Sequence, residues 1–531
     1  MITGKNYIGK SLSAKGSKTF KTFNPKLNIE NETIFYEASQ QEIDNAAILA
    51  HEVFNDYKKT SGIEKSKFLL AIAEEIENLG DSLLQVFCFE SGLAKDRAKS
   101  EKKRTLWQLK MFATLIEKGS WVEATIDTAI LDRNPIAKPD LRKMMFPIGP
   151  VVVFGASNFP LAYSTAGGDT VSALAAGCPV IVKSHPMHAG TGELVASAII
   201  KAAKRTGMPN GVFSNLNSSG IEVGVNLVKN PLIKAVGFTG SIKGGRALFD
   251  LANQRKEPIP VFAEMGSVNP VVLLPESAKK NFKKLAKTYA NSITLGSGQF
   301  CTNPGLIIGI KSDSLNNFIQ ELAYKIVKVE PSCMLHPKII GNYKKNKDKV
   351  ESQKGVFVAA EFEQSANKNY GRQVIMTVEG DVFLENTTLH HEVFGPFSLV
   401  VQCEDSIQLL KIINSLEGQL TGTVWAEKSE VKKYEKVINA LQNKVGRIIF
   451  NGVSTGVEVC DSMNHGGPYP ASTDSRFTAV GVHSIKRWIR PVSFQNWPNR
   501  VLPNELKDEN PLGIMRIVNG EYTSRSILYP E

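Results

Sequence analysis

Apolar positions in the first quarter of the chain follow a helical period. Leu69, Ile72 and Ile76 recur at intervals of three and four residues, which places them on one face of a helix. We therefore expect residues 36–119 to be mostly helical. Residues 121–145 are less periodic and contain two prolines, which favours strands or an excursion from the core.

From residue 150 onward, short β-branched runs alternate with helices rich in small residues. This alternation is typical of a parallel, doubly wound sheet and predicts an α/β fold. A second α/β region is expected from about residue 270 to about residue 460, and the tail from Arg490 is expected to form an arm. The expected elements of the first region are strands at 151–154, 180–183 and 235–238 and helices at 170–176, 191–206 and 244–253.

Length and composition narrow the class of protein. A chain of 531 residues is too long for one ordinary core, so we expect two or three domains. The six cysteines are widely spaced, which argues against a disulfide framework and for a reducing compartment. Residues 1–16 lack the apolar stretch of a secretory signal, and the most apolar stretch, 144–163, is broken by prolines and glycines. We therefore expect a cytoplasmic protein with no membrane span.

The formal net charge of +11 raises the question of an anionic partner. Lysines cluster at residues 279–287 and 343–349, but Phe282 and Leu285 give the first cluster an apolar stripe, as on a solvated amphipathic helix. Nucleic-acid binding would require basic residues interleaved with aromatic ones, or a recognised module, and the sequence has neither. We expect no nucleic-acid partner, while electrostatic steering of an anionic substrate stays open.

One cysteine differs from the others in its context. Cys301 lies in the segment 298–305 (GQFCTNPG), an irregular stretch that follows an apolar run. A thiol on a loop, where backbone N–H groups can point at it or at its substrate, suits covalent catalysis. We therefore interpret Cys301 as a candidate nucleophile rather than as an inert core residue.

Three upstream segments accompany this cysteine: 156–160 (ASNFP), 238–241 (FTGS) and 264–270 (EMGSVNP). Together they resemble the aldehyde dehydrogenase superfamily, and the likeness extends over nearly the whole chain. Within it, the chain is most similar to bacterial 2-oxoglutarate semialdehyde (2,5-dioxopentanoate) dehydrogenases and their NADP-linked fatty-aldehyde relatives. The segments that carry this closer likeness include 154–161 (FGASNFPL), 166–170 (AGGDT), 173–179 (ALAAGCP) and 257–261 (EPIPV).

The resemblance implies an α/β aldehyde dehydrogenase fold with three parts. A Rossmann-like cofactor-binding domain with a parallel sheet would comprise residues 1–120 and 148–265, and an α/β catalytic domain residues 266–460. Oligomerisation strands and a C-terminal arm would comprise residues 121–147 and 485–531. The family usually forms dimers or tetramers, so a homodimer or homotetramer is expected.

The resemblance also implies three catalytic roles. Cys301 would be the nucleophile that forms a thiohemiacetal and then a thioester, and Asn158, with the backbone N–H of Cys301, would stabilise the oxyanion. Glu264 would be the general base for hydrolysis. Because Glu264 ends an apolar strand, we expect burial to raise its pKa. Many members carry Leu-Gly-Gly after this glutamate, where this chain has Met-Gly-Ser, a change that the branch tolerates.

For the cofactor, the resemblance points to a glycine-containing strand–helix turn and to residues around the nicotinamide. Glycines let the backbone approach a pyrophosphate, and a helix N-terminus favours its negative charge. Pro186 stands where NAD-preferring relatives have an acidic residue for the ribose 2′-hydroxyl, so we expect NADP, with NAD as the alternative. The implied cofactor-binding residues are Ser157, Lys183, Gly240, Ser241, Gly245, Glu392 and Phe394.

Substrate recognition is predicted around one helix. Arg104, Gln108 and Phe112 lie at i, i+4 and i+8 and so share a helix face, which borders the substrate tunnel in the family. We hypothesise that Arg104 binds a distal carboxylate, the alternative being a surface arginine in a Lys-Lys-Arg run. The other candidates for the tunnel wall are Phe159, Tyr163, Phe300 and Thr302.

The expected reaction is NADP-dependent oxidation of 2,5-dioxopentanoate to 2-oxoglutarate in sugar-acid or hydroxyproline breakdown. Oxidation of medium or long aliphatic aldehydes by the same residues is the first alternative, and an inactive scaffold is the second. A coenzyme A-dependent, acylating enzyme is disfavoured because Glu264 is present. The eight histidines show no ligand spacing, so no metal is expected.

Overall fold

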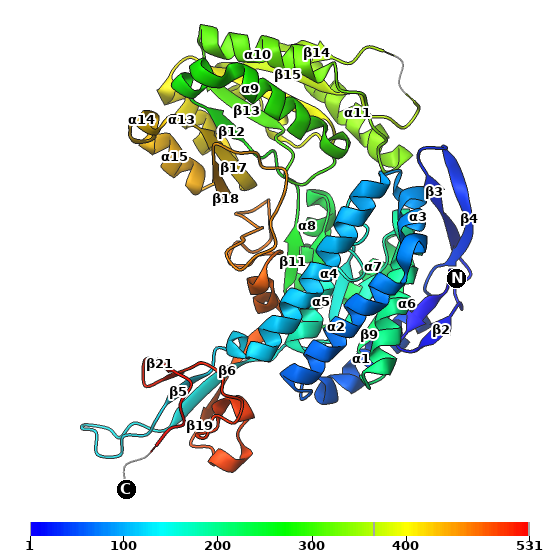
Figure 1. Ribbon diagram of the computed structural model, residues 1–531, viewed down its shortest axis with the longest axis vertical. Helices are drawn as coiled ribbons and strands as arrows, with labels where there is room; N and C mark the ends of the chain where they lie inside the picture. Colours follow the sequence, from blue (N-terminus) through cyan, green and yellow to red (C-terminus); the bar gives the residue numbers. More distant parts are fainter. Residues whose placement is uncertain (1, 365–366, 529–531) are drawn as a thin grey trace.

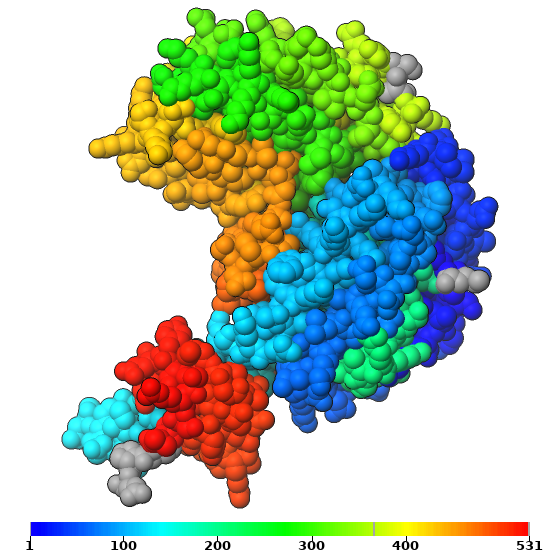
Figure 2. Space-filling view, viewed as in Figure 1, coloured from blue at the N-terminus to red at the C-terminus, as the bar shows by residue number. Residues whose placement is uncertain are grey.

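The computed structural model describes residues 2–364 and 367–528 and contains three large sheets and a hairpin. In Figure 1, the second sheet with its green and yellow helices lies above the first sheet, whose helices are coloured from blue to green. The third sheet projects from the first at the lower left (Figures 1 and 2). The hairpin pairs β3 (Thr19–Asn24) with β4 (Ile29–Tyr36).

The first sheet has seven strands in the order β11-β10-β7-β8-β9-β1-β2. The five strands from β11 to β9 are parallel, and β1 joins β9 in the antiparallel sense. Parallel strands end at the same edge of a sheet, so the loops that follow them gather there. The strands are β1 (Asn6–Ile8), β2 (Ser11–Ser13), β7 (Val151–Phe154), β8 (Val180–Lys183), β9 (Phe213–Leu216), β10 (Ala235–Thr239) and β11 (Val261–Glu264).

Helices cover both faces of this sheet, because its strands are apolar on both faces. Val151 and Val153 belong to one buried cluster, with α2 to α6, whereas Val152 belongs to the other, with α1, α7 and α8. The helices are α1 (Gln40–Tyr57), α2 (Gly62–Asn78), α3 (Gly80–Ser91), α4 (Lys95–Lys118), α5 (Gly168–Ala176), α6 (Ala189–Arg205), α7 (Glu222–Lys229) and α8 (Ile242–Asn253).

The second sheet repeats this plan in the order β14-β15-β16-β13-β12-β17-β18, with only β14 antiparallel among its seven strands. Its strands are β12 (Val271–Leu273), β13 (Leu306–Ile310), β14 (Val356–Glu361), β15 (Val374–Glu379), β16 (Phe397–Cys403), β17 (Gln419–Trp425) and β18 (Val445–Phe450). Its helices are α9 (Pro275–Thr294), α10 (Asp313–Ile326), α11 (Pro337–Glu351), α12 (Gly380–Glu385), α13 (Ser406–Ser415), α14 (Lys428–Lys433) and α15 (Glu435–Gln442).

The third sheet joins two segments that are far apart in the sequence. Its order is β19-β6-β5-β20-β21, built from β5 (Thr125–Asp127), β6 (Leu141–Pro147), β19 (Ile489–Gln495), β20 (Arg516–Val518) and β21 (Glu521–Thr523). Short 3-10 helices complete the described chain: η1 (Ser120–Val122), η2 (Pro186–His188), η3 (Leu295–Gly298), η4 (Thr387–His390), η5 (Val482–Trp488), η6 (Asn499–Val501) and η7 (Asn504–Leu506).

The elements expected from the sequence pattern are confirmed, with shifts of one or two residues at their ends. The strands at 151–154 and 180–183 have the expected bounds, and the helix expected at 170–176 begins at Gly168. The segment 121–145, expected to form strands or an excursion, contains β5 and most of β6. The expected domain boundaries stay a prediction. Their ranges include residues 1, 365–366 and 529–531, which lie outside the described residues.

In the part of the chain that the structure describes, the helices are all too short or too polar to cross a membrane.

Two phenylalanines on α3 allow a matched test of the packing of the helices beside the first sheet. Phe87 is fully buried in a cluster with residues of α4 and α6, whereas Phe89, two positions further along α3, has 56% of its surface exposed. Because large-to-small changes in a core lose transfer energy and leave a cavity, Phe87→Ala should cost about 3–5 kcal/mol of unfolding free energy. Phe89→Ala should cost less than about 1 kcal/mol. Urea unfolding of both variants checks this, and equal losses would contradict the packing described.

Candidate active site

The loop that carries Cys301 is held by close backbone packing. Gly298 has a left-handed φ of 66°, and a Cβ at this position would lie 2.1 Å from the carbonyl oxygen of Gly395. Only glycine allows that approach. The side-chain amide of Asn269 donates to the carbonyl oxygen of Cys301 at 2.8 Å. The thiol is therefore fixed between the two sheets, and Cys301 is half-buried.

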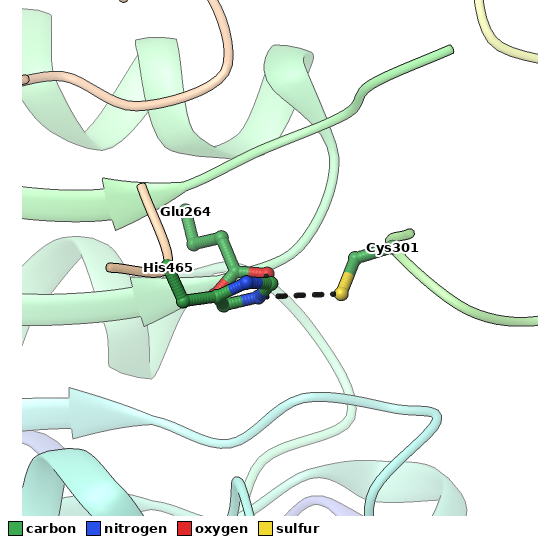
Figure 3. A group of neighbouring side chains, drawn as sticks. All are labelled: Glu264, Cys301 and His465. Carbon is green, nitrogen blue, oxygen red and sulfur yellow. Dashed lines mark hydrogen bonds and ion pairs between the residues drawn. The ribbon is translucent and has the colours of Figure 1, made fainter. Parts of the chain in front are cut away.

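Cys301 forms a compact group with Glu264 and His465 (Figure 3). The imidazole Nε2 of His465 lies 2.9 Å from Glu264 Oε1 and 3.5 Å from Cys301 Sγ. Glu264 ends β11, and a bridge between Glu264 and Ser472 joins the His465 loop to this strand. The three side chains thus come from β11 and from two loops that are distant in the sequence.

Two members of this group, the Glu264 carboxylate and the thiolate form of Cys301, would repel each other. Burial raises the pKa of the Cys301 thiol well above its usual value, and the nearby Glu264 carboxylate adds to this rise because it repels a thiolate. Burial alone would also raise the pKa of Glu264, as expected from the sequence. Its interactions with His465 and the Cys301 thiol outweigh burial, however, so the pKa of Glu264 is lowered. The expectation of a raised pKa was wrong because it took no account of His465.

Asn158 lies on the loop after β7, close to the thiol. Its Nδ2 donates to the carbonyl oxygen of Gln299 at 3.0 Å, which leaves the second N–H of the amide for another acceptor. Arg97 on α4 donates to the carbonyl oxygen of Asn158, and its guanidinium lies 4.4 Å from the ring centre of Phe159 and 4.8 Å from that of Phe300. Arg97 therefore joins the Asn158 loop to the Cys301 loop.

A cavity of about 260 Å³ reaches Cys301 from the side of α4. Its wall includes all five residues expected from the sequence at the substrate tunnel: Arg104, Phe159, Tyr163, Phe300 and Thr302. The Nη2 of Arg104 donates to the Tyr163 hydroxyl at 2.8 Å, and its Nε is buried with no hydrogen-bond partner among the described residues. Arg104 is thus half-buried in a cavity and not a surface arginine, as the alternative interpretation held.

A second cavity, of about 290 Å³, reaches Cys301 from the edge of the first sheet. Thr239, Gly240 and Ser241, which lead into α8, line this cavity, and Ser241 caps the helix by accepting from the N–H of Gly244. The N-terminus of α8 therefore lies beside the cavity, a place that suits the pyrophosphate of a dinucleotide. A Cβ at Gly245 would lie 2.6 Å from Met265 Sδ, so a side chain at this position of α8 would displace Met265. Five of the cofactor residues expected from the sequence line this cavity: Ser157, Gly240, Ser241, Glu392 and Phe394.

Glu392 and Lys183 are the charged members of the expected cofactor set. Burial raises the pKa of Glu392 to about 7, which suits a carboxyl group that meets sugar hydroxyls more than one paired with a cation. Lys183 ends β8, its Nζ donates to the carbonyl oxygen of Ser218 at 3.2 Å, and burial lowers its pKa to about 8. Lys183 is paired in register with Phe154 of β7, at the edge where the other expected residues gather.

Two residues of this site were missed from the sequence. His465 lacks any ligand or triad spacing, and its only signal is the run 465–468 (HGGP), a glycine-rich loop like that of Cys301. Arg97 gave no signal of its own, but it lies seven residues before Arg104 and therefore on the same face of α4. The roles of both residues can be recognised only from the contacts that they make in the folded protein.

The chain is similar to known proteins over nearly its whole length. The sequence profile of the aldehyde dehydrogenase family matches residues 12–488. The chain is 44% identical to an alpha-ketoglutaric semialdehyde dehydrogenase of Acinetobacter baylyi and 42% identical to alpha-ketoglutaric semialdehyde dehydrogenase 2 of Azospirillum brasilense. Each alignment covers 98% of this chain and 99% of the relative.

Among solved structures, the fold is similar to that of betaine aldehyde dehydrogenase from Staphylococcus aureus in complex with NAD+. The TM-score is 0.80, and the match covers 93% of this chain and 95% of that one at 18% sequence identity. The resemblance expected from the sequence is therefore confirmed by the family profile and by near-full-length relatives. This chain belongs to the aldehyde dehydrogenase family.

Proposed function

We propose that this aldehyde dehydrogenase oxidises 2,5-dioxopentanoate to 2-oxoglutarate with NADP, with Cys301 as the nucleophile. The observation that carries this proposal is the position of Cys301, His465 and Glu264 between two cavities. One cavity lies beside a helix N-terminus, which suits a dinucleotide, and the other has arginine and aromatic side chains, which suit a short anionic aldehyde.

The first chemical step needs a thiolate, which the resting site disfavours. The thiol proton must therefore leave as the sulfur attacks the carbonyl carbon, and the Glu264 carboxylate, which His465 keeps ionised and which interacts with the thiol, takes it. The aldehyde oxygen then becomes an alkoxide. We assign the stabilisation of this charge to the second N–H of the Asn158 amide, which does not take part in the bond to Gln299, with a contribution of roughly 3 kcal/mol for one donor.

A nicotinamide dinucleotide bound in the cavity beside β10 and α8 would supply the acceptor for the hydride that leaves the thiohemiacetal carbon. Ser241 and the N-terminus of α8 would hold its pyrophosphate, and Glu392 and Phe394 its nicotinamide ribose and ring. Pro186 follows β8 and brings no carboxylate toward a 2′-phosphate, and Lys183 offers a cation for it. These features support NADP over NAD.

Hydrolysis of the thioester on Cys301 needs a base for water. Glu264 serves in this step because its carboxylate is kept ionised by His465 and because its Oε2 has no hydrogen-bond partner among the described residues. Water adds to the acyl carbon, Glu264 takes its proton, and the thiol group of Cys301 leaves with the recovered proton. This step distinguishes the enzyme from one that transfers the acyl group to coenzyme A.

Arg104 is our proposed partner for the distal carboxylate of the substrate. Its hydrogen bond to Tyr163 holds the guanidinium at the cavity wall, and its buried Nε has no hydrogen-bond partner among the described residues, so a donor is left for a carboxylate. The printed names of the two bacterial relatives, both alpha-ketoglutaric semialdehyde dehydrogenases, support the same substrate. The aromatic rings of Phe159 and Phe300 also favour a second candidate, an aliphatic aldehyde.

We also propose that the third sheet joins subunits in a homodimer or homotetramer, through residues 121–147 and 485–531. This sheet projects from the rest of the chain in Figure 2. Leu131 and Ile136, in the loop between β5 and β6, and Tyr522 of β21 are exposed apolar side chains that a monomer would leave in water.

The function is tested by steady-state kinetics of the purified enzyme with 2,5-dioxopentanoate or hexanal and with NADP or NAD. We expect kcat/KM for the dioxo acid with NADP to exceed that for hexanal by at least about tenfold, which corresponds to 1.4 kcal/mol. NADP should also be the better cofactor. A preference for hexanal would reject the substrate but keep the family chemistry, and loss of all activity in Cys301→Ser is the control for the nucleophile.

The role of Arg104 predicts a selective defect. Arg104→Met should raise KM for 2,5-dioxopentanoate roughly ten- to hundredfold, because a hydrogen bond to a charged group contributes about 1.5–3 kcal/mol. KM for hexanal should stay unchanged. Lys103→Met, which removes an exposed charge from the next position on α4, is the matched control. An equal rise for both aldehydes would mean that Arg104 supports the cavity wall and does not bind the carboxylate.

The raised pKa of the Cys301 thiol predicts how the reactivity of this residue depends on pH. Since the pKa of the thiol is raised, alkylation by iodoacetamide should rise with pH throughout the interval from about pH 7 to about pH 9. Glu264→Gln removes the repelling carboxylate and should lower this pKa. Alkylation at a given pH then becomes faster, by about tenfold for each unit of pKa. Slower alkylation in this variant would mean that the carboxylate activates the thiol more than it repels the thiolate.

A further inference from the structure

The group at the centre of the site contains three different metal-binding atoms. Cys301 Sγ, His465 Nε2 and a carboxylate oxygen of Glu264 all lie within 4.8 Å of one another. Thiolate, imidazole and carboxylate are the three protein ligands that Zn²⁺ accepts. Figure 3 shows the three side chains converging on one point from separate parts of the chain.

The two separations that involve His465 are compatible with a tetrahedral ion. Bonds of about 2.3 Å to sulfur and about 2.0–2.1 Å to nitrogen place these two atoms about 3.5 Å apart at a tetrahedral angle. The separation of Sγ and Nε2 is 3.5 Å. The carboxylate oxygen lies 2.9 Å from Nε2 and would move outward by a few tenths of an ångström, roughly 0.4 Å, to reach the corresponding position.

Charge and access also suit a divalent ion. A thiolate and a carboxylate together carry two negative charges, which would neutralise Zn²⁺ in a site where His465 and Glu264 are almost fully buried. The ion would remove the repulsion between the Glu264 carboxylate and the thiolate. Both cavities open onto Cys301, so an ion has a route inward and room for water as a fourth ligand.

We propose that Cys301, His465 and Glu264 form a site that binds one Zn²⁺ and thereby switches the enzyme off. Binding forms Zn–S, Zn–N and Zn–O bonds and releases the thiol proton to water, with no change of oxidation state. The sulfur is then held as a metal ligand and cannot attack an aldehyde, and the carboxylate cannot take a proton from water. The sequence alone gave no reason to expect a metal, because the three ligands share no spacing motif.

The test is a Co²⁺ titration of the full-length protein after treatment with a chelator, followed by optical absorption. We expect one equivalent to bind with an intense sulfur-to-cobalt band in the near ultraviolet, and Zn²⁺ to displace it. Cys301→Ser should abolish the band, and His465→Asn should weaken binding by at least about tenfold. Cys460→Ser and His483→Asn, which alter the same residue types outside the group, should bind like the unaltered protein.

Circular dichroism and alkylation of Cys301 allow the proposal to be tested even if one variant does not fold. If His465→Asn does not fold, as judged by circular dichroism, unaltered protein alkylated at Cys301 replaces it, and this protein should show no cobalt band. A band that persists after alkylation or in Cys301→Ser would overturn the proposal, as would unchanged affinity in a folded His465→Asn. Cobalt binding requires neither aldehyde nor nucleotide, so the outcome is independent of the proposed substrate and cofactor.

Discussion

This site depends on one constraint: a thiol, an imidazole and a carboxylate lie in mutual contact, and the imidazole and the carboxylate are almost fully buried. Such a group persists only if its charges are balanced, and here His465 keeps Glu264 ionised while burial, together with the Glu264 carboxylate, keeps Cys301 protonated. The site can therefore transfer a single proton between the thiol and the carboxylate. Its reactivity follows from this balance more than from any single residue.

The helix α4 supports this group from outside. Glu101 accepts from the backbone N–H groups of Leu161 and Ala162 and pairs with Arg97, which in turn contacts the loops of Asn158 and Cys301. Burial raises the pKa of Glu101, and Arg97 opposes the rise. A buried pair of this kind is weak as a source of stability, but it fixes positions, because breaking it leaves an uncompensated charge.

Local pattern predicted much of the fold, and motif resemblance predicted most of the site. The strand at 151–154 was predictable because β-branched residues buried on both faces leave a continuous apolar run, and the candidate Cys301 because its loop has an unusual context. The lowered pKa of Glu264 and the contact of Arg104 with Tyr163 were not predictable. Each depends on a neighbour that is distant in sequence.

The sequence by itself determined the family, the alternation of strands and helices, and which residues are able to react. These properties can be recognised from local composition and short motifs, without knowing which residues contact one another in the fold. Only the tertiary structure decided that His465 meets Cys301 and Glu264, because the bridge from Glu264 to Ser472 joins loops more than two hundred residues apart. Side-chain charge is a local property, but the proton that a side chain holds depends on the groups that folding brings beside it.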